Sequence, residues 1–338
     1  MQKRLRVIFN RGITLLIPVA GSLLAGSLLI WLAGEKAIPT YINLFNAGFS
    51  CTKWAGRCAL LTTLQFATPL VFSGLSAVVA LRAGFFSIGQ AGQMLFGAAA
   101  AAWVGAHLGM HPAIHPATAL LAAVLFGALW GIVPALLREF IGVNEIISTL
   151  LLNPIAGFLV GQVWIPRISE SAYLVPLVPG TKVTVGLLLA LAAVISVYLF
   201  LWRSGKGLEI RNNAQAHKFA VYGGIKKHAP VLTAMAVSGA LAGLAGAVEV
   251  LGVHYRFVSS FSAVNDFDGL IVAFAGYLHP IGALVLSVLL GGLRSGAIVG
   301  LQIRSGIPRE LGGALIALML IFAAMHSFYR VNGKHGKR

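Results

Sequence analysis

Three groups of polar side chains lie inside long apolar stretches of this sequence. The first is GVNEIISTLLLN at residues 142–153, where Asn144 precedes Ser148 by four residues and Thr149 precedes Asn153 by four. On a helix this spacing puts each pair on one face, so the four residues form a polar stripe. Lipid would leave the stripe without hydrogen-bond partners. It therefore faces either a neighbouring helix, as interhelical hydrogen bonds require, or a substrate path.

The other two groups combine amides or acids with small residues. In FSIGQAGQMLFGAAAAAW at 86–103, Gln90 and Gln93 are three residues apart among glycines that permit a break or close helix packing. We interpret the two glutamines as candidates for a substrate path. In NDFDGLIVAFAGYLHP at 265–280, Asp266 and Asp268 open a short apolar segment. Either they belong to the path, or they only complement the helix dipole at its start.

Enzymatic and metal-binding patterns are missing from the sequence. It contains no G-x-x-x-x-G-K-[ST] loop for phosphates and no H-E-x-x-H pair for zinc. Cys51 and Cys58 have no histidine nearby to complete a metal site, and they form either a disulfide or two free thiols. We therefore expect no enzyme, no metal site and no cofactor.

The composition indicates the elements that must hold these groups. Hydrophobic residues make up 58% of the 338 residues, charged residues 10%, and the mean hydropathy is +0.88. This composition excludes a soluble globular protein and predicts an all-α polytopic membrane protein, one domain over residues 1–338. The ten apolar segments that we expect to span the membrane lie near 13–32, 60–81, 84–107, 115–137, 144–164, 183–202, 231–252, 264–279, 281–303 and 310–329. The segment at 84–107 is rich enough in glycine and alanine to be broken.

The positive charge follows the membrane topology. The formal net charge is +16, which by itself would suit nucleic acid. Most of the lysines and arginines, however, fall in alternate connections and at the two ends if the N-terminus is cytoplasmic. Ten spans then return the C-terminus to the cytoplasm. We expect contact with a membrane and none with nucleic acid.

A polar segment at residues 203–230 interrupts the apolar pattern. It carries six lysines and arginines against one acid, Glu209, between two apolar runs. Asn212 or Asn213 is expected to be the N-cap of a short helix that ends at Gly223 and Gly224. Such an amphipathic helix suits docking of a soluble partner. The plainer interpretation is a solvated basic loop.

Four stretches together resemble the permease subunits of bacterial ATP-binding-cassette importers for simple sugars and nucleosides. They are LRAGFFSIGQAGQMLFGA at 81–98, GVNEIISTLLLNPIA at 142–156, GLEIRNNAQAHKFAVYGGI through SGALAGLAGAVEVLG at 207–252, and FDGLIVAFAGYLHPIGAL at 267–284. The resemblance covers roughly residues 60–325 and is closest to the nucleoside branch. The sequence departs from that branch at Ser87, at Gln90-Ala91 and at Pro154, which affects the substrate more than the fold.

The resemblance implies a mechanism and partners. The chain would be the permease in a bacterial inner or plasma membrane, carrying a nucleoside or simple sugar. It would pair with a second permease, a cytoplasmic ATPase and a periplasmic or lipid-anchored substrate-binding protein. The coupling helix that contacts the ATPase would contain Asn213, Ala216, Phe219, Ala220 and Tyr222.

Two other classes of protein compete with this interpretation. An ion-coupled secondary transporter would use Glu145, Glu249, Asp266 or Asp268 as its proton or sodium carrier. A membrane scaffold would use the polar stripes only to hold helices together.

Overall fold

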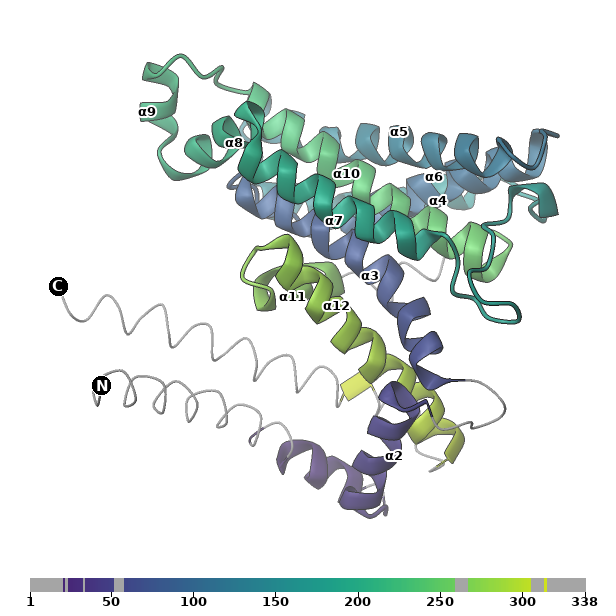
Figure 1. The fold of residues 1–338 in the computed structure, drawn as a ribbon. Helices are drawn as coiled ribbons and strands as arrows, with labels where there is room; N and C mark the ends of the chain where they lie inside the picture. Colours follow the sequence, from purple (N-terminus) through teal and green to yellow (C-terminus); the bar gives the residue numbers. More distant parts are fainter. Residues whose placement is uncertain are drawn as a thin grey trace, which may run out of the picture. The chain divides into compact units, whose positions relative to one another are not determined.

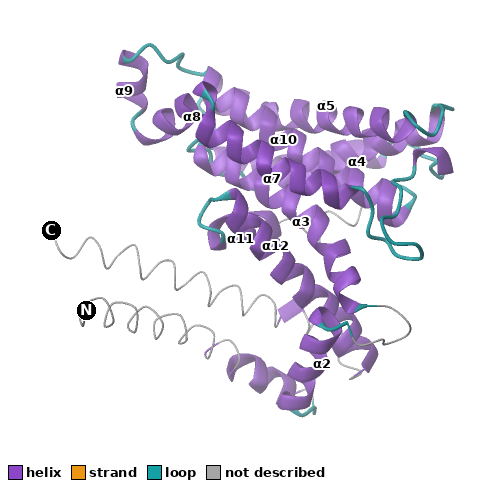
Figure 2. Ribbon diagram, in the orientation of Figure 1, coloured by secondary structure: helices purple, strands orange, loops and turns teal. Residues whose placement is uncertain are grey.

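A computed structural model describes residues 21, 24–32, 34–51, 58–258, 267–304 and 313–314. Figure 2 shows that the regular elements in these ranges are helices joined by loops. The only β contact in the described ranges is an isolated bridge between Pro176 and Thr184. The all-α class predicted from composition is confirmed.

Most of the predicted apolar segments correspond to a described helix. The α-helices are α2 (Ala37–Phe49), α3 (Ala59–Arg82), α4 (Gln90–His107), α5 (His115–Leu136), α6 (Glu145–Gly161), α7 (Gly186–Arg203), α8 (Gly205–Gln215), α9 (His217–Tyr222), α10 (Ala229–Glu249), α11 (Asp268–Ala275) and α12 (Pro280–Ser295). The π-helical turns η1 (Leu137–Ile141), η3 (Val250–His254) and η5 (Gly296–Arg304) follow α5, α10 and α12, and η2 (Glu170–Ala172) is a short 3₁₀ turn.

Five of the described helices are long and apolar enough to cross a membrane. They are Ala59–Arg82, His115–Ile141, Gly186–Arg203, Ala229–His254 and Pro280–Gln302. The shorter apolar helix α6 adds to these. The count of ten spans stays a prediction, since most of 13–32 and nearly all of 310–329 lie outside the described residues.

Three elements differ from the predicted segments. Helix α2 lies between two predicted segments and was not expected. Helix α4 begins only at Gln90. The break expected within 84–107 therefore lies at residues 84–89, before the helix starts. Helix α11 has 8 residues and is about 12 Å long, too short to cross a hydrocarbon layer of about 30 Å alone. Because residues 264–266 lie outside the described part of the chain, the span predicted over 264–279 stays a prediction.

The contacts within the chain divide it into two compact units, Met1–Phe66 with Leu289–Arg338, and Ala67–Val288. The single domain expected over 1–338 stays a prediction. In the first unit, α2 packs on η5, where Ile30, Leu44, Ala297 and Leu301 form a core.

In the second unit, α4, α5 and α10 pack together (Figure 1). A Cβ added at Gly239 of α10 would overlap the carbonyl of Gly127 on α5, and one at Gly243 would overlap the carbonyl of Ala123. The contacts advance in opposite directions along the two chains, so α5 and α10 are antiparallel. Because the backbones touch, only glycine fits at this crossing.

Helices α4 and α10 run parallel. Gly97 lies against Gly243, and a Cβ at Gly105 would be 3.6 Å from Leu251 Cδ2, so both contacts have the same offset in sequence. Gln93 precedes Gly97 by one helical turn and Gln90 precedes Met94 by one turn. Because a Cβ at Gly246 of α10 would overlap the carbonyl of Met94, each glutamine lies one turn before a residue of α4 that contacts α10.

Candidate functional site

Two side chains of α6 hold the beginning of α4. Asn153 Oδ1 accepts a hydrogen bond from Gly92 N at 3.0 Å, and Asn153 Nδ2 donates to Ile88 O at 2.9 Å. One turn earlier, Thr149 Oγ1 accepts from Ile88 N at 3.2 Å and donates to Glu145 O at 2.6 Å. In this conformation the predicted stripe therefore makes interhelical hydrogen bonds at these two positions. Their part in a substrate path stays a prediction.

The segment at 84–89 needs these bonds because its backbone is not helical. Gly84 adopts φ +71°, which glycine tolerates without cost. Arg138 Nη1 donates to Gly84 O at 3.0 Å, and its guanidinium carbon lies 5.2 Å from the ring centroid of the buried Phe85. A Cβ at Gly92 would lie 2.8 Å from Trp130 Nε1, so α4 approaches its neighbours closely only with glycine there.

The first two residues of the stripe serve α6 itself. Asn144 is the N-cap of α6, and its side chain accepts from Ile146 N at 2.9 Å and Ile147 N at 3.4 Å. Ser148 Oγ donates to Glu145 O at 3.2 Å within the same helix. The capping role was missed at the sequence level, although an Asn followed directly by Glu at a helix start is a recognised signal.

Gln90 and Gln93 are buried without full hydrogen bonding. Their exposed fractions are 0% and 1%. Gln90 Nε2 donates to Ser87 O at 3.2 Å, but Gln90 Oε1 and both polar atoms of Gln93 have no partner among the described residues. An unpaired buried amide costs about 1–3 kcal/mol, and such groups call for an explanation. These are the strongest candidates for a site that acts in another state.

Aromatic rings lie beside this part of α4. Phe96 stacks on Trp130 with ring centroids 4.0 Å apart. Phe86 packs against Phe274 of α11 at 6.0 Å. These contacts place apolar rings around the polar start of α4. They also show that the rings have partners within the chain in this conformation.

The third predicted group is only partly described. Asp266 lies outside the described residues. Asp268 is the first residue of α11, as the dipole argument expects, and it makes interactions of its own. A Cβ at the next residue, Gly269, would overlap Ser73 Oγ of α3, so the two helices approach closely there.

Two of the carboxylates that a secondary transporter would use, Glu145 and Glu249, lie beside basic side chains. Arg138 Nε lies 3.7 Å from Glu145 Oε2. Glu249 Oε2 lies 3.3 Å from His254 Nε2. No group of three His, Cys, Asp or Glu residues suited to a metal ion occurs in the part of the chain that the structure describes.

The polar segment at 203–230 forms two helices, with its helix start elsewhere than predicted. The N-cap predicted at Asn212 or Asn213 is wrong, because both residues lie inside α8 and the helix that ends at Gly223 has Ala216 as its N-cap. Helix α8 itself begins at Gly205, where Ser204 Oγ accepts from Gly207 N at 3.0 Å. The chain breaks at Ala216, which adopts φ −150°. The predicted end at Gly223 and Gly224 is confirmed, since Gly223 is the C-cap of α9 and Gly224 has φ +87°.

The predicted docking residues fall into two classes. Phe219 and Tyr222 on α9 are 78% and 91% exposed. Ala216 is also exposed, whereas Ala220 and Asn213 are buried. The five predicted docking residues therefore do not all lie on the exposed surface, and their docking role stays a prediction. The break at Ala216 turns α9 relative to α8 and leaves two aromatic rings in the open.

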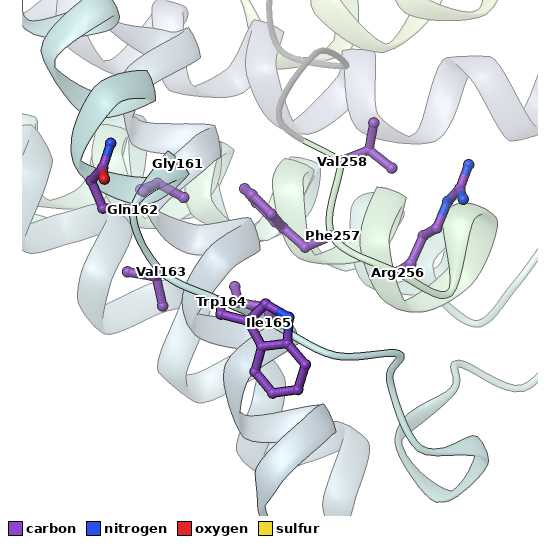
Figure 3. Close-up of a pocket in the computed structure, with 9 residues that line it drawn as sticks. Gly161, Gln162, Val163, Trp164, Ile165, Arg256, Phe257 and Val258 are labelled. Carbon is purple, nitrogen blue, oxygen red and sulfur yellow. The ribbon is translucent and has the colours of Figure 1, made fainter.

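A cleft of about 530 Å³ lies where α6 ends, between residues 160–165 and 256–258 (Figure 3). Phe257 projects toward Gly161, whereas Arg256 projects to the opposite side. Tyr255 precedes these residues, with its ring centroid 4.2 Å from that of Tyr173. Burial, and secondarily Tyr173, raises the pKa of Tyr255, so its phenol stays neutral at physiological pH. The cleft was not predicted; the signal available in the sequence was a tryptophan, Trp164, just after an apolar run.

Comparisons with known proteins agree on one family. Residues 59–324 match the family described as branched-chain amino acid transport system / permease component. The guanosine ABC transporter permease protein of Bacillus subtilis is 33% identical over 95% of this chain and 95% of its own. The nucleoside permease protein of Lactococcus lactis subsp. cremoris is 28% identical over 92% of this chain and 90% of its own.

A third relative is named for a sugar. The glucose ABC transporter permease protein of Haloferax volcanii is 30% identical over 80% of this chain and 77% of its own. No solved structure matches the chain.

Proposed function

Because this chain belongs to the branched-chain amino acid transport system / permease component family, we propose that it carries a nucleoside across the membrane. The chain is a multi-pass transport subunit and not an enzyme. The relative named for guanosine supports this substrate best, since it matches 95% of the chain at the highest identity of the three relatives described above. The relative named for glucose covers less of the chain, which makes a simple sugar the second candidate.

The energy for transport comes from another chain. The sequence has no phosphate-binding loop of its own, and the relatives are named as permeases of ABC transporters. The partners in this proposal are a cytoplasmic ATPase, a second permease and a periplasmic or lipid-anchored substrate-binding protein. The complex sits in the bacterial inner or plasma membrane with both termini of this chain in the cytoplasm.

The ATPase docks on α9. Phe219 and Tyr222 are large aromatic side chains that are exposed among the lysines and arginines of residues 203–230. Exposed aromatic residues at the centre of a patch are the usual anchors of an interface. Ala216 lies at the break between α8 and α9. Ala220 and Asn213 are buried and hold α9 and α8, respectively, on the rest of the chain.

The substrate path includes Gln90 and Gln93. Their unpaired buried amides suit hydrogen bonds to a nucleobase or a ribose when α4 and α10 separate. Thr149 and Asn153 then act mainly by positioning the start of α4, whereas Asn144 and Ser148 act on the first turn of α6. Asp266 and Asp268 stay predicted path residues at the start of α11. Glu145 and Glu249 are already paired, so no observation favours an ion-coupled transporter.

The test is substrate-stimulated ATP hydrolysis by this chain copurified with its ATPase and substrate-binding protein. Guanosine, a pentose and glucose are compared at equal concentration. We expect stimulation by the nucleoside. Phe219→Asp should abolish stimulation while leaving membrane insertion intact, because it places a charge in an apolar anchor. Phe219→Leu keeps the apolar contact and should retain most of the stimulation.

Two results would contradict the proposal. Stimulation by glucose or pentose and not by guanosine would assign the chain to sugar transport. Full stimulation of the Phe219→Asp complex would exclude α9 as the dock.

A further inference from the structure

Two arginine side chains lie next to the ring of one tryptophan of α7, Trp202. The guanidinium carbon of Arg82, the last residue of α3, lies 5.1 Å from the ring centroid of Trp202. That of Arg211, on α8, lies 5.8 Å from the same centroid. A cation near the face of an indole is attracted by about 0.5–2 kcal/mol. Two cations on one ring also repel each other.

No acidic side chain compensates these two charges. Among the described residues, no Asp or Glu lies within ion-pair distance of Arg82 or Arg211. The contrast is Arg138, whose Nε lies 3.9 Å from Glu139 and 3.7 Å from Glu145. Arg138 therefore has carboxylates nearby, whereas Arg82 and Arg211 have none among the described residues.

The backbone fixes Arg82 in place. Arg82 Nε donates to Leu278 O at 2.9 Å, and its Nη2 donates to Tyr277 O at 3.4 Å. Tyr277 and Leu278 have φ values of +58° and +53°, which residues other than glycine rarely adopt.

The remaining donors of the pair are available. Arg211 Nε makes a longer bond, 3.4 Å, to Gly207 O. Arg82 Nη1 and both Nη groups of Arg211 have no hydrogen-bond partner in the described chain.

The location suits the head-group region of a membrane. Trp202 is the last residue but one of α7, one of the five apolar helices long enough to cross the membrane. Tyr198 stacks on Trp202 at 5.7 Å, and the polar helix α8 follows directly. Tryptophan and tyrosine gather at this level of membrane proteins, and arginine reaches anionic head groups there.

We propose that Arg82, Arg211 and Trp202 bind the phosphate group of an anionic lipid. Guanidinium groups match phosphate oxygens in geometry and charge. The indole forms an apolar wall beside the lipid's glycerol backbone. A bound phosphate removes the repulsion between the arginines, and it links α3, α7 and α8 next to the turn at residues 276–279.

The experiment uses the purified full-length chain in a neutral detergent. Short-chain phosphatidylglycerol, phosphatidylcholine with the same acyl chains, and inorganic phosphate are titrated separately. The readout is the tryptophan fluorescence, compared with that of Trp202→Phe, since the chain has six tryptophans. We expect a saturable change with phosphatidylglycerol that is absent in Trp202→Phe, and binding of phosphatidylcholine at least about tenfold weaker.

Matched variants separate a built site from general attraction. Arg211→Gln should weaken phosphatidylglycerol binding by about tenfold or more, because it removes charge-assisted hydrogen bonds. Lys226→Gln removes the same charge from the exposed turn after α9 and should change binding by less than about twofold. Arg82→Gln should weaken binding as well, and Arg211→Gln carries the test if that variant does not fold.

Two outcomes would overturn the proposal. Equal weakening by Arg211→Gln and Lys226→Gln would mean that only the net charge attracts the lipid. Inorganic phosphate that binds as tightly as phosphatidylglycerol, with the same dependence on Arg211, would make the ligand a soluble anion and not a lipid.

Discussion

The amide side chains near the start of α4 differ in whether their polar atoms have partners. Asn153 uses both ends of its amide, on Gly92 N and Ile88 O. Gln93 uses neither end in the described chain. A protein gains little stability by keeping an unpaired amide in its core, since an apolar residue of the same size would be at least as stable there. The burial of Gln93 therefore favours a role in transport over one in folding.

Exchange of each amide for leucine tests this difference. Gln93→Leu should leave the melting temperature of the purified chain unchanged or raised, and should lower nucleoside uptake at least tenfold. Asn153→Leu should destabilise the chain by about 1–3 kcal/mol, because two backbone groups lose their partners. Thermal unfolding in detergent and uptake in cells measure the two effects. A loss of stability in Gln93→Leu as large as in Asn153→Leu would show that Gln93 is a structural residue.

At the scale of elements, the close crossing of α5 and α10 requires that certain residues have no side chain, because a single added Cβ would overlap the backbone of the other helix. Gly127, Gly239 and Gly243 bring the two backbones into contact. Hydrophobic burial does not drive helix association inside a membrane, so this packing supplies much of what holds the helices together.

Gly239→Ala should therefore destabilise the chain by about 1–3 kcal/mol, because the new methyl group overlaps the carbonyl of Gly127. Gly109→Ala is the matched control, since a Cβ at Gly109 meets no atom within 4 Å. Both variants are compared by thermal unfolding in the same detergent. Equal melting temperatures would mean that the helices are farther apart than described here.

Elements set by local composition were predictable from the sequence, and those set by distant contacts were not. The extent of α3 follows from an apolar run, and the end of α9 follows from two glycines. The late start of α4 depends on Thr149 and Asn153, which are 61 residues away from the backbone groups they bind. The N-cap of α9 was misplaced because Asn212 and Asn213 match the capping preference, whereas the observed N-cap, Ala216, has no side chain that can cap a helix. Only the position of the helix decides among them.

The same limit applies to the candidate site. The sequence correctly marked Gln90, Gln93, Thr149 and Asn153 as polar residues within apolar surroundings. It did not distinguish the two residues that hold the fold from the two that have unpaired polar atoms, because hydrogen bonding depends on the neighbouring helices. The pairing of Arg82 and Arg211 on Trp202 brings together α3, α7 and α8, and no spacing in the sequence indicates it.

At the scale of the whole molecule, the disulfide and the charges imply one orientation in the membrane. Cys51 and Cys58 are joined in the structure, and disulfides persist in oxidising compartments outside the cytoplasm. Helix α3 follows this loop and has 24 residues, about 36 Å of helix, which is enough to cross the membrane. We therefore propose that Arg82 at its end lies on the cytoplasmic side, together with the lysines and arginines of residues 203–230. The rule for positive charges gives the same answer independently.

This orientation predicts where introduced and native thiols react. In right-side-out membrane vesicles, a membrane-impermeant maleimide should label Cys51 when Cys58 is replaced by serine. A chain with both native cysteines replaced by serine and Lys226→Cys should be labelled only after the vesicles are opened, since position 226 lies in the segment that we propose to dock the ATPase. Inverted vesicles should give the opposite pattern. Labelling of position 226 from outside would place α8 and α9 away from the cytoplasm, and an ATPase there could neither meet ATP nor drive this chain.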